Sequence, residues 1–102
     1  MDKNEVINLA KRYANEVTKE INPEKIVLYG SHASGTAKND SDIDIAVICN
    51  GFTGDFLQAS SHLCSLTWDI SSLIEPVLLD RARDKSGFVE EVIRSGEVIY
   101  QR

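Results

Sequence analysis

Two short apolar segments, joined by a small polar connection, constrain this chain more than any other feature. The first, KIVLY at residues 25–29, ends directly before Gly30, and the second begins at Asp42 and reads DIDIAVIC. Both have the β-branched and aliphatic composition of strands. The connection, residues 31–41, is shorter than the dozen or more residues that a parallel crossover usually takes. We therefore expect an antiparallel pair in which Gly30 lies beside Asp42.

The second strand begins with two carboxylates, Asp42 and Asp44. Alternate residues of a strand share one face, with Cα atoms roughly 6.5–7 Å apart, so Ile43 and Ile45 point the other way into a core. Neighbouring carboxylates repel each other unless a cation lies between them, and Mg²⁺ prefers one or two carboxylates together with phosphate oxygens. Two such ions can bind the attacking and leaving oxygens of an in-line displacement. The motif predicts a divalent metal site suited to phosphoryl or nucleotidyl transfer.

The end of the first strand is suited to phosphate. Gly30 has no Cβ to keep a phosphate from its backbone, and Ser31 adds a hydroxyl and an N–H group. If residues 31–35 form one helical turn ended by Gly35, its first N–H groups offer further donors to a triphosphate.

These residues also have three other interpretations. A Gly-Ser pair alone is a common turn, and an Asp-x-Asp strand start can be a solvated rim. A calcium loop beginning at Asp40 is disfavoured, because Ile45 stands where its glycine belongs and Gly51 where its glutamate belongs. The two halves of the motif become specific only in combination, at this spacing and with strands on both sides.

The rest of the chain has further periodic segments. Asp2 and Glu5 fit a capping box at the start of the first of them, an expected helix. Pro76 indicates a sheet edge or a bulge. Gly96 stands where a left-handed helix cap belongs. The expected elements are helices over 2–21, 55–68 and 86–95 and strands over 73–79 and 98–100. The helix over 55–68 is expected to bury Phe56, Leu57, Leu63, Cys64 and Leu66.

Composition bounds the class of protein. The 102 residues are 42% hydrophobic, enough for a single domain over 1–102, and the net charge of −5 without a basic cluster disfavours direct nucleic-acid binding. Cys49 and Cys64 lack metal-type spacing and are expected to be buried free thiols, which suits a reducing compartment. The charged N-terminus is unlike a signal peptide and no apolar run could span a bilayer. We expect a cytoplasmic protein without a membrane partner.

These residues resemble the minimal nucleotidyltransferases (MNT) of the DNA polymerase beta superfamily. The element order agrees over nearly the whole chain, and the small size resembles the MNT half of two-gene HEPN–MNT toxin–antitoxin modules. The resemblance implies an α+β fold of two layers, a mixed sheet with helices packed on it. Its signature consists of Gly30-Ser31, Gly35, Ser41-Asp42-x-Asp44 and an aliphatic strand, and the tail SGFVEEVIRSGEVIY is also similar.

The resemblance implies Mg²⁺-dependent transfer of a nucleoside monophosphate, AMP from ATP, to an acceptor hydroxyl. It assigns Asp42 and Asp44 to the metal and Gly30 and Ser31 to the triphosphate. The family usually has a third acidic residue on a later strand, which helps to bind the metal and to remove the proton of the acceptor. Glu75 is our candidate for this metal ligand and catalytic residue, with Asp69 as its competitor. A HEPN-type toxin is the implied partner, and the protein its antitoxin.

The motif also departs from the family pattern. Where many relatives carry a basic residue in this loop, His32 and Ser34 stand here, and Lys38 is the one lysine or arginine between Gly30 and Asp42. We predict Lys38 as a phosphate contact and His32 as a solvated loop residue. Asp40 is expected to be a solvated neighbour, and Asp80, after the third strand, is a weaker candidate acid.

Two other functions fit the same residues. A catalytically weak module could neutralise a toxin sterically, since cations are scarce in the loop. A small-molecule nucleotidyltransferase acting on an aminoglycoside-type cation is the third alternative, because the acidic surface attracts cations. The sequence leaves open the acceptor, the preferred base and whether the protein forms a homo- or hetero-oligomer.

Overall fold

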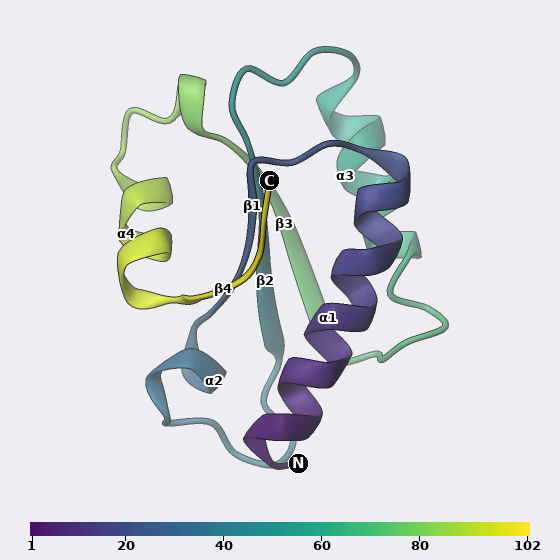
Figure 1. The fold of residues 1–102 in the computed structure, drawn as a ribbon, viewed down its shortest axis with the longest axis vertical. Helices are drawn as coiled ribbons and strands as arrows, with labels where there is room; N and C mark the ends of the chain where they lie inside the picture. The colour runs from purple at the N-terminus through teal and green to yellow at the C-terminus, as the bar shows by residue number, and fades with distance from the viewer.

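A mixed four-stranded sheet of order β3-β2-β1-β4 forms the centre of the molecule. The computed structural model describes residues 1–102 and places α1 and α3 on one side of the sheet and α4 on the other (Figure 1). The expected α+β fold with a mixed sheet is confirmed. In chain order the elements are α1 (Lys3–Glu20), β1 (Lys25–Tyr29), α2 (Ser31–Ser34), β2 (Ile43–Cys49), α3 (Phe56–Ser65), β3 (Ile74–Asp80), the 3₁₀ turn η1 (Arg81–Arg83), α4 (Phe88–Ser95) and β4 (Glu97–Gln101).

The central strands β1 and β2 pair antiparallel, as the short connection predicted. Their register places Lys25 opposite Ile48 and Tyr29 opposite Asp44. The connection forms one turn of helix, α2, which ends at Gly35 with a left-handed φ of 82°. The end of β1 and the start of β2 therefore lie at one end of the sheet, beside α2 (Figure 1).

Strand β3 is an edge strand that pairs only with β2, and it runs parallel to it. The crossover between them carries α3, the usual solution for parallel neighbours. Pro76 lies within this edge strand, opposite Ile45, in agreement with the expected edge position. The parallel register also places Glu75 opposite Asp44.

The two faces of the sheet bury different sets of side chains. The larger cluster lies against α1 and α3, and the smaller one lies under α4. The first includes Val6, Tyr13, Ile26, Leu28, Ile43, Ile45, Val47, Leu63 and Leu78, and the second consists of Val27, Ala46, Ile48, Val89 and Val92. Because strand residues alternate between faces, Asp44 and Glu75 lie on the face that α4 covers in part.

The prediction for the helix over 55–68 is corrected in two respects. The regular helix ends at Ser65, and much of its expected apolar side faces solvent: Leu57 is 77% exposed, and Phe56 and Cys64 are also exposed. Leu63 is the buried member of that set. The physical reason is that α3 packs at the edge of the sheet, against β3, so only a narrow stripe meets the core. Cys49 is buried as expected.

Gly96 also differs from expectation. It follows α4 with φ −90° and ψ −174°, an extended conformation rather than a left-handed cap. A Cβ at this position would lie 2.5 Å from Val27 Cγ1 and 2.7 Å from the Leu28 carbonyl oxygen. The glycine is thus required by the close approach of the chain to β1.

The first helix agrees with its sequence signals. Asp2 caps it by accepting a hydrogen bond of 2.8 Å from the Glu5 N–H, and Val6, Tyr13 and Val17 are fully buried. None of the helices has the length and apolar character needed to cross a membrane.

Candidate functional site

Asp44 lies at the centre of the candidate site, packed against the backbone of Gly30. Gly30 has a φ of +75°, and a Cβ built there would lie 2.4 Å from Asp44 Oδ2. Glycine is therefore required twice, once for the backbone conformation and once for the space that the carboxylate occupies. Through this contact the phosphate motif and the carboxylate motif form one site.

Three carboxylates act on one another at this end of the sheet. The pKa of Asp44 is raised above its ordinary value, first by burial, then by the charge of Asp42 and then by that of Glu75, while His32 opposes the shift. Asp42 and Glu75 are exposed, whereas Asp44 is half-buried. Burial and two neighbouring negative charges thus both disfavour the ionised form of Asp44, and His32 offsets part of their effect.

The donor set fits a magnesium ion that also takes ligands from substrate. No three His, Cys, Asp or Glu side chains converge on a common point, so the chain does not form a closed all-protein cage. Mg²⁺ is usually held by one or two carboxylates, with phosphate oxygens and water completing its octahedron. Asp42 and Asp44 supply carboxylates of this kind, and a cation beside them would offset the repulsion that helps to raise the pKa of Asp44.

The turn α2 presents backbone donors next to these carboxylates. The Gly30 carbonyl accepts hydrogen bonds from the Ala33 and Ser34 N–H groups, at 3.1 and 3.0 Å. The N–H groups of Ser31 and His32 stand ahead of these bonds, in the first turn, where a helix offers no acceptor of its own. The expected turn is thus present, and no side chain caps its first N–H groups.

His32 is buried, contrary to the prediction of a solvated loop residue. Only 6% of it is exposed, and its Nε2 atom lies 3.3 Å from the Ser41 carbonyl oxygen. Its own carbonyl accepts a hydrogen bond of 2.9 Å from Lys3 Nζ. The prediction was wrong because it treated the loop as free, whereas α2 folds back on the segment that leads into β2.

Tyr29 is a residue of this site that we did not identify from the sequence. It lies opposite Asp44 in the register and so shares its face. Its ring makes an edge-to-face contact with Phe88 of α4, with ring centroids 6.1 Å apart. Burial raises the pKa of Tyr29, and the charge of Asp44 adds to the shift. Tyr29 directly precedes Gly30, so the predicted antiparallel pairing with the strand that carries Asp44 could have indicated that it lies at this site.

The remaining candidates fall into two groups. Lys38 and Asp40 are exposed in the loop before β2, and the Lys38 N–H donates to Ser41 Oγ at 2.8 Å. Asp69 lies elsewhere, in a groove between α1 and the turn after α3 that Arg12 and Glu16 also line. It is not among the charges that act on Asp44.

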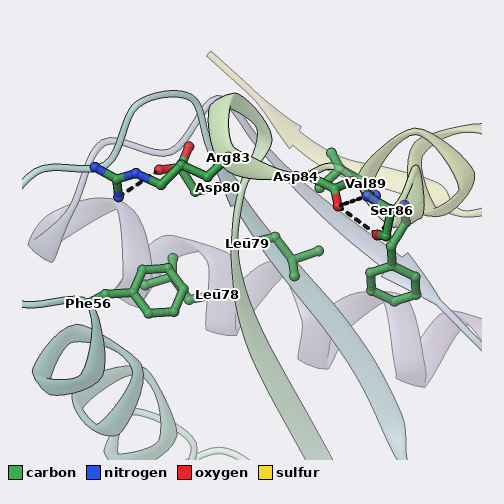
Figure 2. A pocket seen from close by; sticks show the side chains of 9 residues that line it. Phe56, Leu78, Leu79, Asp80, Arg83, Asp84, Ser86 and Val89 are labelled. Carbon is green, nitrogen blue, oxygen red and sulfur yellow. Dashed lines mark hydrogen bonds and ion pairs between the residues drawn. The ribbon is translucent and has the colours of Figure 1, made fainter.

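Asp80 lies within β3 rather than after it, at the opposite end of the strand from Glu75. Its carboxylate accepts the Gly51 and Phe52 N–H groups at 2.8 and 3.0 Å and forms an ion pair with Arg83. Beside it lies a mostly apolar pocket of about 440 Å³, shown in Figure 2. Because Asp80 is used to hold the chain after β2, it has a structural role.

Comparisons with known proteins identify the family of this chain. The polymerase beta, nucleotidyltransferase family matches residues 5–102. This chain therefore belongs to that nucleotidyltransferase family. Comparison with curated proteins returned no significant match.

Similar solved structures come from the same class. A protein from Sulfolobus solfataricus assigned as a nucleotidyltransferase superposes with a TM-score of 0.72 at 23% identity, over 98% of this chain and 84% of that one. A toxin–antitoxin complex with AMP-PNP gives 0.64 at 25%, over 90% and 73%. A complex of a tri-AMPylated HEPN toxin with an MNT antitoxin, from Shewanella oneidensis, gives 0.60 at 22%, over 94% and 73%.

The charge on Asp44 is expected to cost stability. Its folded-state pKa lies above the ordinary value, so the folded chain binds this proton more tightly than the unfolded chain does. The free energy of unfolding therefore falls as the pH rises from the ordinary pKa through the raised one. Without divalent metal, Asp44→Asn should raise Tm by a few degrees at pH 7, and the gain should shrink at a pH below the ordinary pKa of Asp44.

Thermal melts in EDTA at several pH values measure this effect. Asp40→Asn, an exposed carboxylate of the same loop, is the matched control and should leave Tm nearly unchanged. A lower Tm for Asp44→Asn at pH 7 would contradict the electrostatic assignment.

Proposed function

We propose that this protein transfers AMP from ATP to a hydroxyl group of a HEPN-type toxin, in a Mg²⁺-dependent reaction, and acts as the antitoxin of that toxin. The observation that carries the proposal is the packing of Gly30 against Asp44, with Asp42 and Glu75 within electrostatic reach. Family membership supports nucleotidyl transfer. The structural likeness to toxin–antitoxin complexes supports the partner.

In this proposal the oxygen of the acceptor hydroxyl forms a bond to the α-phosphorus of ATP. The bond from the α-phosphorus to the oxygen bridging it to the β-phosphorus breaks, and pyrophosphate leaves with that electron pair. Glu75, next to Asp44 in the register, takes the hydroxyl proton. Bound Mg²⁺ supplies charge neutralisation of the phosphates, and Asp42 and Asp44 would hold it.

The triphosphate is assigned to the other half of the site. The backbone at Gly30, the hydroxyl and N–H of Ser31 and the Lys38 ammonium group would bind its oxygens. Backbone donors at the start of a turn stabilise anions without carrying a net charge. They suit a chain whose net charge is −5.

The partner is proposed to complete the site. Asp42 and Glu75 are exposed, so no element of this chain covers them from solvent. An acceptor protein docked over this face would exclude water and align its hydroxyl with the α-phosphate.

The proposed compartment is the cytoplasm. Its reducing conditions suit the two free thiols, Cys49 and Cys64.

ATP labelled at the α-phosphate tests the proposal directly. The purified protein is incubated with labelled ATP, Mg²⁺ and a HEPN-type toxin encoded beside it, and label on the toxin and released pyrophosphate are measured. We expect both, in equal amounts, and neither after EDTA treatment. Absence of label on the toxin with intact protein and Mg²⁺ would refute the proposal.

Glu75→Gln is expected to lower kcat about 10²-fold, at the lower end of the range for loss of general base catalysis. The KM for ATP should change little, because Glu75 is not among the triphosphate contacts. Asp69→Asn, which removes the competing carboxylate, should leave kcat unchanged. If Asp69→Asn lowers kcat and Glu75→Gln does not, Asp69 is the third acidic residue.

Steric neutralisation is the second candidate, favoured by the scarcity of free cations near the phosphate-binding turn. The Lys3 ammonium beside this turn is engaged by the His32 carbonyl and Glu97. Lys38 is exposed and makes no ion pair within the chain. If binding alone neutralises the toxin, the variant with asparagine at both Asp42 and Asp44 will protect cells fully. If AMP transfer is required, that variant will bind the toxin without protecting.

A further inference from the structure

We infer that His32 is a positioning residue that fixes the phosphate-binding turn α2 against the strand that carries Asp42 and Asp44. The inference rests on the proposed function for its catalytic consequence, although its structural part stands on the contacts of His32 alone. The ring joins two segments nine positions apart in the chain, the α2 turn and Ser41. Ser41 directly precedes Asp42.

The contact with Ser41 determines which ring nitrogen carries a proton. The Ser41 atom is a backbone carbonyl oxygen, which can only accept a hydrogen bond. The His32 Nε2 atom, 3.3 Å away, must therefore be the N–H donor. If the ring turned away, the partly buried Ser41 carbonyl would lose this donor, so the hydrogen bond keeps the ring in place.

His32 is also held from the other side. Lys3, in the first turn of α1, donates from Nζ to the His32 carbonyl oxygen at 2.9 Å, and its ammonium lies 3.5 Å from Glu97 of β4. The backbone of His32 is thus linked through Lys3 to α1 and β4, while its ring contacts Ser41. The loop between, with exposed Gly35, Thr36 and residues 38–40, is held mostly by hydrogen bonds within itself, such as that from the Lys38 N–H to Ser41 Oγ, so the His32 ring supplies its buried side-chain contact.

The geometry separates this role from direct substrate contact. His32 is 94% covered by the chain, being 6% exposed, and its Nε2 atom is already engaged. Besides its effect on the pKa of Asp44, His32 acts on the reaction through the distance between the α2 donors and the carboxylates. An error of about 1 Å in such a distance can cost 10²-fold in rate.

Two substitutions of His32 test the inference, with the other histidine as control. His32→Leu keeps an apolar group of moderate size and removes the donor, whereas His32→Gln keeps an N–H donor on a flexible side chain. His62, the second of the two histidines, is exposed and pairs with Glu20, so His62→Leu should be neutral. We expect His32→Leu to lower kcat roughly 10–100-fold with less than about threefold change in KM for ATP, and His32→Gln to recover part of kcat.

Measurements without catalysis decide the structural part. Nitrogen-15 NMR of the histidine rings should show His32 protonated at Nε2, and amide hydrogen exchange over residues 31–41 should be faster in His32→Leu than in wild type or His62→Leu. A ring protonated only at Nδ1, or unchanged exchange in His32→Leu, would overturn the inference. Unchanged kcat would overturn it as well. If the wild type transfers no AMP, the proposed function fails, while NMR and exchange still test the position of His32.

Discussion

Replacing Asp42 and Asp44 together by asparagine is expected to reduce AMP transfer at least about 10³-fold. Metal-assisted charge stabilisation contributes several kcal/mol to such reactions, and each 1.36 kcal/mol is tenfold in rate. The fold should survive, because neither side chain belongs to the buried clusters. Transfer of label from ATP to the toxin, measured in single turnovers, gives the rate for each variant.

Asp40→Asn is the matched control for this pair. It removes one negative charge from the same loop, yet Asp40 is exposed and is not among the charges that act on Asp44. Its rate should stay within about twofold of wild type, within the small effect expected of a surface substitution. A double asparagine variant that is folded by circular dichroism and still transfers label would rule out the assigned carboxylates.

Gly30→Ala is expected to damage both stability and activity. The residue would have to adopt a φ of +75°, and its Cβ would lie 2.4 Å from Asp44 Oδ2. Backbone strain of about 1–3 kcal/mol and overpacking of a similar size together predict a loss of roughly 2–6 kcal/mol in unfolding free energy. Displacement of the Asp44 carboxylate should also lower transfer by about 10²-fold.

Gly35→Ala separates the two contributions. Gly35 has nearly the same φ, +82°, but no atom lies within 4 Å of the Cβ position. It should therefore show only the backbone cost, about 1 kcal/mol, with activity close to wild type. Urea denaturation of both variants measures the difference. Equal losses for Gly30→Ala and Gly35→Ala would show that contact with Asp44 is unimportant.

The local parts of this site could be predicted from the sequence. The short connection 31–41 required an antiparallel pair, and the register indeed places Tyr29 opposite Asp44. Strand alternation put Asp42 and Asp44 on one face, away from the core residues Ile43 and Ile45. The pairing and the alternation involve residues close together in the chain, so backbone geometry alone is enough to predict them.

Other features depended on contacts between distant segments and were predicted wrongly. Cys64 and Leu57 were expected to be buried but are exposed. The expectation failed because helical periodicity does not tell how much of a helix its neighbours cover. Gly96 was expected to cap a helix, although the requirement for glycine comes from Val27 and Leu28 on β1. His32 was expected to be solvated, because the sequence does not tell that α2 folds back against Ser41.

That Gly30 and the Asp42–Asp44 pair meet at one end of an antiparallel pair follows from the amino-acid sequence, because the link between the two strands is too short for a parallel crossover. The surroundings of that pair follow from tertiary packing. Glu75 lies beside Asp44 because the crossover through α3 sets the register of β3, and His32 is buried because α2 folds against Ser41. Both outcomes depend on packing between segments far apart or on opposite sides of a loop, which no local pattern records.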